Sequence, residues 1–305
     1  MITTKFSDRT IGICAAVFTG LCWATLAVML KVMLQFSDTF TIAWFRLSAA
    51  FLVLAAWMAW KSPSQLKILT RPPLLALICG LGLAGNYIGY MVGLSLTGAS
   101  NAQIMIQIAP ISLILIGVFY FKEYPTKSQL TGFIIAAAGF ALFYKDQLAS
   151  AAKGSASFNV GNLWIFFAAA SWTTFAAFQK VLLKKYPANQ LNLLNYALGT
   201  VVLFPFCNLA IFPKLDFWQW VMMCVAGLNT VVAYGSLAVA FRKIAASEVS
   251  IIITMNPLIT LLMMFILDQM AVTWVANEPL HLLGAVAAVV VVVGVILAVR
   301  KPKLS

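Results

Sequence analysis

Two stretches with one spacing pattern, FTGLCWATLAVMLK at residues 18–31 and FAAASWTTFAAFQK at residues 167–180, indicate how this chain is organised. Each places Phe, Trp and Lys at the same intervals, with an offset of 149 residues between the two stretches. A second pattern, Tyr-x12-Ser-x9-Pro, begins at Tyr87 and again at Tyr234, with an offset of 147. Two spaced patterns that recur in the same order predict an internal repeat about half the chain long.

Both stretches lie in long apolar runs, and the composition of the whole chain agrees with them. Of the 305 residues, 63% are hydrophobic and only 9% are charged, and the mean hydropathy is +0.97. A soluble domain has about 45–50% apolar and about 25% charged residues, so its polar shell would not cover this much apolar surface. Lipid solvates such a surface, and helices satisfy their own backbone polar groups there. We therefore predict an all-α integral membrane protein.

Ten apolar runs are long enough to span a bilayer, which requires about 20 residues. The predicted helices cover residues 11–34, 39–60, 74–96, 98–121, 128–145, 160–183, 188–211, 217–241, 245–267 and 279–300. The first run is read as a spanning helix, because it is long and has no small-residue cleavage site. These runs divide the chain into a five-helix repeat at 1–148, a flexible linker rich in Ala, Ser and Gly at 149–159, and a second five-helix repeat at 160–305.

The positive charges predict the orientation of these helices. Alternating the ten helices across the membrane puts fifteen of the twenty Lys and Arg residues on one side and four on the other, with Arg46 inside a helix. Positive loops stay in the cytoplasm, so both termini are predicted to be cytoplasmic and the chain to lie in the cytoplasmic membrane. Because five is odd, the second repeat crosses in the opposite sense. Two inverted five-helix repeats around a central cavity are typical of secondary transporters.

Several function classes lack the residues they need. The net charge of +12 lies between apolar runs and mostly on one side, so no nucleic-acid partner is expected. The five cysteines all lie in apolar runs without a C-x-x-C pair, and His281 is the single histidine, so we expect no metal and no cofactor. There is no Walker A motif, which disfavours ATP as the energy source.

Short motifs along the chain resemble those of the drug/metabolite transporter superfamily, in its ten-helix EamA-like family. The first half contributes Trp23, Trp44-Phe45-Arg46, Gly98-Ala99-Ser100, Pro110, Glu123, Gly132 and Gly139. The second half repeats them as Ala245-Ala246-Ser247, Pro257, Asp268, Gly284 and Gly294, but with Asn195 at the position of the arginine. The resemblance implies that helices 1–4 and 6–9 surround the cavity and that helices 5 and 10 lie outside it. Family members carry amino acids, nucleotide sugars, phosphorylated sugars, nucleobases or cationic drugs, and the bacterial branch is linked to amino-acid export.

We therefore predict a secondary transporter that moves a small organic metabolite, an amino acid or a related solute, by alternating access. A multidrug or lipid-intermediate carrier is an alternative, although the lack of a buried carboxylate disfavours cationic drugs. A membrane-embedded enzyme is the other alternative, and scattered carboxylates with one histidine make a poor catalytic set. The expected partners are a small-molecule substrate and membrane lipid, and the expected state is a monomer or a weak dimer.

The candidate substrate site consists of aromatic and polar residues within the apolar helices. Arg46 lies about 10 Å into its helix, where a charge usually faces a cavity and can hold a carboxylate or phosphate. Its alternative role is structural, as a helix cap or a snorkelling side chain. Aromatic walls would suit an aromatic side chain or an organic cation, and plain helix packing is equally compatible with them. The predicted binding residues are Trp23, Arg46, Asn86, Tyr87, Tyr90, Gln103, Gln107, Trp172, Asn229, Tyr234 and Asn256.

Two pairs of equivalent residues are candidates for gating. Lys31 and Lys180 lie near helix ends at opposite membrane faces, either as gates or as snorkelling side chains. Pro110 and Pro257 are predicted mid-helix, where proline allows a bend. Glu248 is the best candidate for proton coupling, but with no other carboxylate near a helix core we expect a facilitator or an exchanger.

Overall fold

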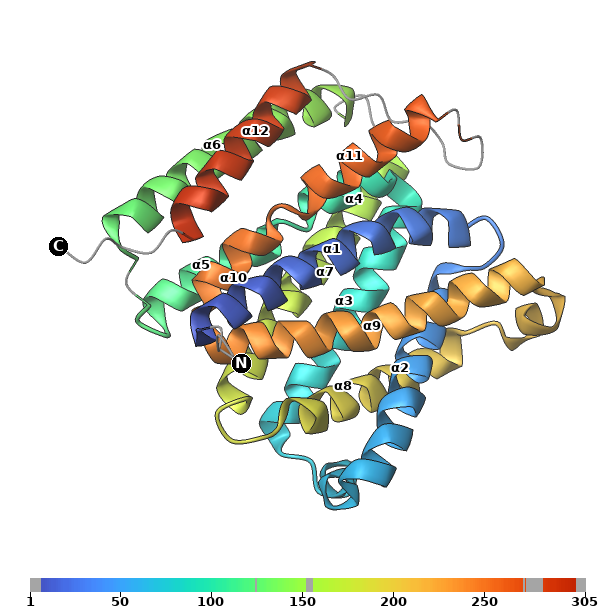
Figure 1. Cartoon of the computed structure of the whole chain (residues 1–305). Coiled ribbons are helices and arrows are strands. Elements are labelled where there is room, and N and C mark those ends of the chain that lie inside the picture. The colour runs from blue at the N-terminus through green and yellow to red at the C-terminus, as the bar shows by residue number, and fades with distance from the viewer. Residues whose placement is uncertain (1–6, 124, 152–155, 271, 273–281, 300–305) are drawn as a thin grey trace, which may run out of the picture.

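The computed structural model describes residues 7–123, 125–151, 156–270, 272 and 282–299, and every regular element in that part of the chain is a helix (Figure 1). The α-helices are α1 (Asp8–Met33), α2 (Thr39–Lys61), α3 (Leu74–Thr97), α4 (Ala99–Met105), α5 (Ile108–Phe119), α6 (Lys127–Ala151), α7 (Ala156–Leu182), α8 (Ala188–Leu203), α9 (Phe217–Lys243), α10 (Ala246–Ile253), α11 (Asn256–Gln269) and α12 (Leu282–Val299). Three 3-10 helices lie in the connections: η1 (Pro63–Leu69), η2 (Phe204–Phe206) and η3 (Leu209–Lys214).

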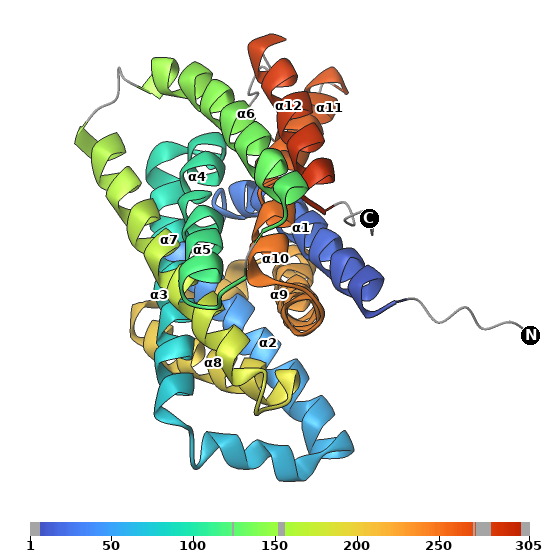
Figure 2. The same ribbon diagram turned by 90° about the vertical axis from the view of Figure 1, so that its left-hand side faces the viewer.

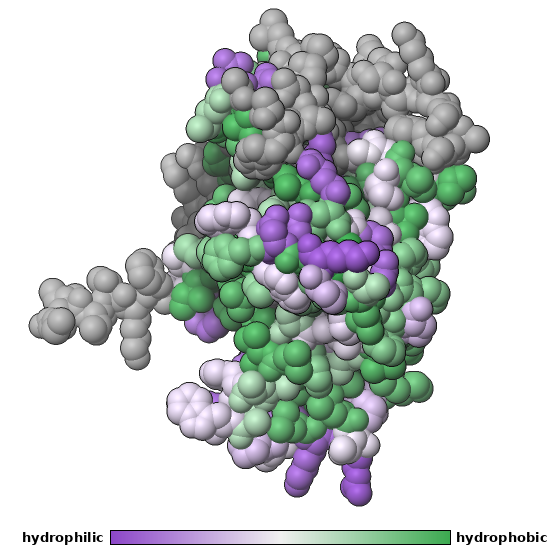
Figure 3. All heavy atoms as spheres, turned by 90° about the vertical axis from the view of Figure 1, so that its right-hand side faces the viewer, coloured by the Kyte–Doolittle hydropathy of each residue, from purple (hydrophilic) through white to green (hydrophobic). Residues whose placement is uncertain are grey.

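The surface of the bundle is apolar, as a lipid environment requires. Leu163 and Val201 expose 70% and 71% of their surface, and hydrophobic side chains cover much of the face in Figure 3, with hydrophilic ones in small separate groups. Seven helical segments in the described residues are long and apolar enough to cross a membrane. They are Asp8–Met33, Thr39–Lys61, Leu74–Thr97, Asn101–Phe119, Asn159–Leu182, Phe217–Lys243 and Ala246–Gln269. The prediction of an all-α membrane protein is confirmed.

Capping side chains set where several helices begin. The Ser7 hydroxyl accepts a hydrogen bond from the Thr10 amide at 3.1 Å at the start of α1. The Asp38 carboxylate accepts from the first amides of α2, and Asp216 forms a capping box with Gln219 at the start of α9. These oxygens accept from amides that have no partner within the helix, and this fixes the residue at which each helix begins.

Two of the predicted helices are broken rather than continuous. The run at 98–121 forms α4 and α5, and the run at 245–267 forms α10 and α11. Pro110 lies in the first turn of α5, and Pro257 is the second residue of α11. Proline fits a first turn because its missing N–H is not needed there. Each proline therefore lies at the start of a new helix, and not in the middle of a continuous helix as predicted.

The boundaries differ from the predictions at two further places. The segment 149–159, predicted as a flexible linker, is helical at 149–151 and at 156–159, where alanine favours helix, and its residues 152–155 lie outside the described part of the chain. The helix predicted at 188–211 stops at Leu203, since Pro205 cannot continue it and the chain turns into η2.

The two halves of the chain interlock, because most helix packing joins one half to the other. The most extensive contacts pair α3 with α7, α6 with α12, α1 with α9 and α2 with α8 (Figures 1 and 2). The helices α6 and α12 lie together at the edge of the bundle (Figure 1). The core that positions the cavity is therefore shared by both halves.

The pairing of α3 with α7, the most extensive of these, uses glycines on one face of α3. We call Gly82, Gly85, Gly89 and Gly93 the glycine seam. A Cβ atom on Gly89 would lie 2.7 Å from the carbonyl oxygen of Trp164, and one on Gly82 would lie 2.9 Å from that of Ser171. Glycine is thus required where α3 meets the backbone of α7, as is common between membrane helices.

Candidate functional site

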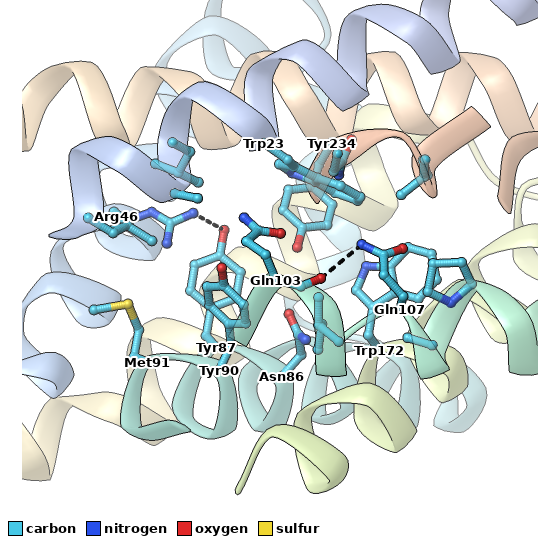
Figure 4. Close-up of a pocket in the computed structure, with 18 residues that line it drawn as sticks. Trp23, Arg46, Asn86, Tyr87, Tyr90, Met91, Gln103, Gln107, Trp172 and Tyr234 are labelled. Carbon is cyan, nitrogen blue, oxygen red and sulfur yellow. Dashed lines mark hydrogen bonds between the residues drawn. The ribbon is translucent and has the colours of Figure 1, made fainter. Parts of the chain in front are cut away.

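A cavity of about 690 Å³, including its mouth, lies at the centre of the bundle (Figure 4). It lies toward the end of the bundle where α1 and α3 finish and α2 begins, which we call the cavity end. Ten of the eleven predicted binding residues line it: Trp23, Arg46, Asn86, Tyr87, Tyr90, Gln103, Gln107, Trp172, Tyr234 and Asn256.

Aromatic residues from equivalent positions of the repeat meet at this cavity. The rings of Trp23 and Trp172 lie 6.0 Å apart, edge to face, and those of Tyr87 and Tyr234 lie 6.3 Å apart. Trp23 also packs edge to face on Tyr234 at 5.5 Å. Such geometry is favourable for aromatic pairs and holds the wall of the cavity in one shape.

Arg46, two turns into α2, faces the cavity and is only 5% exposed. Its Nη2 donates to the Tyr87 hydroxyl at 3.2 Å, and its guanidinium carbon lies 4.6 Å from the centre of the Tyr87 ring. The Tyr87 hydroxyl in turn donates to Thr230 Oγ1 at 3.3 Å. The buried Nε of Arg46 makes no hydrogen bond within the described residues. The arginine can therefore accept a further, anionic partner.

Amide side chains complete the polar part of the lining. Asn86 donates to the Ala168 carbonyl at 3.1 Å, and the Asn256 amide, in its satisfied orientation, donates to the carbonyls of Gly20 and Ile253. Gln107 donates to the Gln103 carbonyl at 3.2 Å, while its buried Oε1 has no donor in the described structure. The two asparagines join helices, and Gln107 retains a free acceptor beside the cavity.

Asn229 is the predicted binding residue that does not line the cavity. Its Nδ2 donates to the Cys22 carbonyl at 3.0 Å, so the side chain joins α9 to α1. A polar residue in an apolar helix needs a partner, and here that partner is a backbone carbonyl.

The lining also includes apolar residues that the sequence reasoning missed. They are Leu26, Ala27, Leu30, Met91, Ile106, Ala109 and Ile253. Those on α1 follow Trp23 at positions i+3, i+4 and i+7, a spacing that places them on one helix face. Ile106 and Ile253 flank the two helix breaks, which hydropathy does not detect.

Among the predicted gating residues, Lys180 belongs to an ionic cluster at the end opposite the cavity. Its Nζ lies 3.1 Å from Glu123 Oε1 and donates to the Ile244 carbonyl at 3.1 Å. The Glu123 carboxylate also accepts from the amides of Ala246 and Ser247, at 3.0 and 3.1 Å, and from the Ser247 hydroxyl at 3.1 Å. We call this cluster the Glu123 latch and this end of the bundle the latch end. The latch joins the α5–α6 turn to α7 and to the start of α10.

The environment of Glu123 favours its charged form. Partial burial raises the pKa of the carboxyl, but the amides of Ala246 and Ser247 and the Lys180 ammonium outweigh burial, so the pKa lies below its ordinary value of 4.5. The preceding residue, Lys122, has a φ of 56°, a left-handed conformation that is uncommon outside glycine. The backbone is therefore strained at the residue that precedes the Glu123 carboxylate.

Of the other gating and coupling candidates, Lys31, Pro110 and Pro257 lie apart from the latch and Glu248 lies beside it. Lys31 is half-buried in the last turn of α1, toward the cavity end. Pro110 lines the cavity, whereas Pro257 does not. Glu248 is buried at the latch end, where Arg9 Nη2 lies 2.6 Å from its Oε1 and Gln129 donates to it at 3.1 Å.

A bundle of apolar helices around a cavity lined by aromatic and amide groups has the architecture that secondary transporters use. The comparisons with known proteins make this specific. The chain belongs to the EamA-like transporter family, whose sequence profile matches residues 10–145 and again 159–300.

The relatives are themselves described as transporters. The chain is 32% identical to an uncharacterized inner membrane transporter, YhbE, of Escherichia coli K12, over 93% of this chain and 89% of the relative. It is 30% identical to an uncharacterized transporter of Haemophilus influenzae, over 96% of each chain. A solved crystal structure shares the fold with a TM-score of 0.71 at 17% identity, over 95% of this chain and 96% of the other.

Proposed function

We propose that this protein is a secondary transporter that carries a small organic metabolite, an amino acid or a related solute, across the cytoplasmic membrane. The observation that carries the proposal is the central cavity, which both halves of the chain line and which lies beside the two helix breaks. Transporters commonly bind substrate at the repeat interface, next to discontinuous helices. In this proposal the ten lining residues bind the substrate, and the protein acts as a monomer or weak dimer and not as an enzyme.

We infer ten spans in two inverted repeats, counting α4 with α5 and α10 with α11 as one broken span each. Three observations support this reading. The family profile matches twice, the breaks fall at equivalent positions, and the helix pairs are related by the repeat. The pairing of α3 with α7 is equivalent to that of α9 with α1, while α6 and α12, like α2 and α8, pair with their own counterparts.

We also infer that the latch end faces the cytoplasm, with both termini on that side. Positive residues near helix ends on this side support the orientation. They include Arg9, Lys122, Lys127, Lys180, Lys184, Arg242 and Lys243. The cavity then lies in the outer half of the bundle, and the Glu123 latch closes the inner half, which corresponds to an outward-facing state.

Alternating access would require the Glu123 latch to open when the cavity end closes. The repeat puts Lys31 in the position that Lys180 holds. Asp268 ends its broken span as Glu123 does, although it follows Pro257 by eleven residues and Glu123 follows Pro110 by thirteen, so we propose Lys31 and Asp268 as the outer gate. The breaks before Pro110 and Pro257 would be the hinges, because backbone hydrogen bonding is already interrupted there.

Reconstituted protein in liposomes tests the function directly. We expect uptake of at least one solute from a panel of amino acids, monocarboxylic acids, nucleosides and sugar phosphates, and loss of that uptake in Trp172→Ala. Trp60→Ala is the matched control, because Trp60 is 80% exposed and does not line the cavity. Failure of the whole panel, or normal uptake by Trp172→Ala, would refute the proposal.

The same liposomes test energy coupling. We expect a facilitator or exchanger, since Glu248 is already paired with Arg9 and does not line the cavity. Uptake should therefore persist when a protonophore collapses the proton gradient. Strict dependence on the gradient would instead identify a coupled pump, with Glu248 as the first residue to substitute.

A further inference from the structure

The cavity has an unbalanced charge. Among the lining residues that the structure describes, Arg46 carries a formal charge and no Asp or Glu accompanies it. The residue is 5% exposed, and its guanidinium is in no ion pair of the described structure and has a buried Nε without an acceptor. Arginine stays protonated in proteins, so the charge is not relieved by loss of a proton. A buried cation without a counter-ion is costly, and an anionic ligand would remove that cost.

The equivalent position in the second half does not need an anionic partner. Asn195, 149 residues after Arg46, donates to Gln179 Oε1 at 3.1 Å, and Gln179 donates to Asn192 Oδ1 at 2.8 Å. Asn192 donates in turn to the Tyr234 carbonyl at 3.2 Å. This amide cluster is satisfied from within the protein. The demand for an anion is therefore confined to the Arg46 side of the cavity.

The amount of charge limits the kind of anion. A phosphate monoester carries about 1.5 to 2 negative charges at neutral pH, which one arginine would leave partly unbalanced in a low-dielectric cavity. A carboxylate carries a single charge and matches the guanidinium fork. A zwitterion would add an ammonium group for which the described lining has no carboxylate.

The rest of the cavity fits an apolar body. Arg46 lies at one end of the view in Figure 4, and Trp172 and Gln107 lie at the other. Trp23, Trp172 and Tyr234 form the wall there, and the free Gln107 Oε1 can accept from one hydroxyl or N–H group.

We propose that the substrate is an organic monocarboxylate with a net negative charge and an apolar, ring-sized body, whose carboxylate binds Arg46. This inference rests on the proposed transport function and narrows it from amino acids and related solutes to acids without a compensating ammonium group.

Three probes with the same body separate the charge types: 3-phenylpropanoate has a carboxylate, phenylalanine has a carboxylate and an ammonium, and 2-phenylethylamine has an ammonium. Binding to the purified full chain is measured by calorimetry, so that diffusion of weak acids through a bilayer does not contribute. We expect the acid to bind at least about tenfold more tightly than phenylalanine, and the amine not to compete.

Substitutions then assign the preference to Arg46. Arg46→Gln should weaken binding of the acid by about tenfold to a hundredfold, and Arg46→Lys by less, since it keeps the charge but loses the fork. Lys61→Gln is the control, because it removes one positive charge outside the cavity. Equal or tighter binding of phenylalanine or the amine, or unchanged binding of the acid by Arg46→Gln, would overturn the inference.

The liposome panel distinguishes this failure from failure of transport. Suppose that the protein takes up a solute that differs in charge from a monocarboxylate, and that monocarboxylates do not inhibit this uptake. The transport function then stands, and the proposal of a monocarboxylate substrate is wrong. Absence of uptake for every solute, together with absence of binding for every acid, would overturn both.

Discussion

Glu123 shows how one carboxylate can hold three segments of this chain together. It accepts from Lys180 on α7 and from the first amides of α10, and it follows the left-handed turn at Lys122. An ion pair whose side chains are 15% and 12% exposed contributes more than a surface pair but still has access to solvent. The latch therefore ties these three segments together at this end of the bundle.

Replacing this carboxylate by an amide tests the latch at the residue scale. Glu123→Gln keeps the shape but removes the nearest counter-ion of the Lys180 ammonium, so we expect a loss of about 1–3 kcal/mol in stability. Thermal unfolding in detergent at neutral pH measures it. Asp216→Asn is the control, because asparagine caps a helix about as well as aspartate. Equal melting temperatures for the two variants would contradict the latch.

The lowered pKa of Glu123 predicts a direction of pH dependence. A carboxyl whose pKa is lower in the folded state stabilises the fold fully above its ordinary pKa of 4.5, and this contribution is lost as the pH falls through the folded-state value. The difference in melting temperature between the wild type and Glu123→Gln should thus be constant above about pH 5.5 and shrink under more acidic conditions. A difference that grows on acidification would exclude this role.

At the scale of helices, the glycine seam determines how closely α3 and α7 approach. A methyl group on Gly89 would meet the Trp164 carbonyl oxygen at 2.7 Å, and backbone cannot move aside as a side chain can. The seam thus fixes the wall of the cavity to which α3 contributes Asn86, Tyr87 and Tyr90.

Two glycine-to-alanine substitutions separate close packing from helix propensity. Gly89→Ala should destabilise the protein by about 1–3 kcal/mol, because the helices must separate. Gly235→Ala should be neutral or stabilising by up to about 1 kcal/mol, because a Cβ there meets no atom within 4 Å. Melting temperatures in detergent compare them, and an equal shift for both would mean that the seam does not set the spacing.

The helices also show what the sequence could predict. Hydropathy located the helical runs because it reports contact with lipid, but it did not detect the breaks before Pro110 and Pro257, which depend on backbone hydrogen bonding. Polar and aromatic residues inside apolar helices predicted most of the cavity lining. Asn229 was misplaced because polarity requires a partner without specifying which one. The role of Glu123 was missed because its partners are far away in sequence.

At the scale of the whole molecule, the two halves are repeats in sequence but not independent bodies. The packing partners of α1, α2, α3 and α6 come chiefly from the second half. Separated halves would therefore expose surfaces, such as the glycine seam, that fit only the missing helices.

Splitting the chain between residues 151 and 156 tests this dependence. Fragments 1–151 and 156–305 should co-purify as a complex when they are expressed together, and each should aggregate or be degraded when expressed alone. Pull-down through a tag on one fragment, followed by size-exclusion chromatography, measures both results. A monodisperse single fragment that unfolds at the temperature of the full chain would show that a half folds alone.

The interlocked packing also has a consequence for biogenesis. Some 85 residues separate the end of α3 from the end of α7, so the ribosome completes the partner of the glycine seam roughly 4–17 s after it has completed α3. During that interval the seam faces lipid or the insertion machinery, with its close-packing face uncovered. Tertiary assembly of the first half must therefore await translation of the second, and the nascent chain passes through a period in which its helices are inserted but not yet packed.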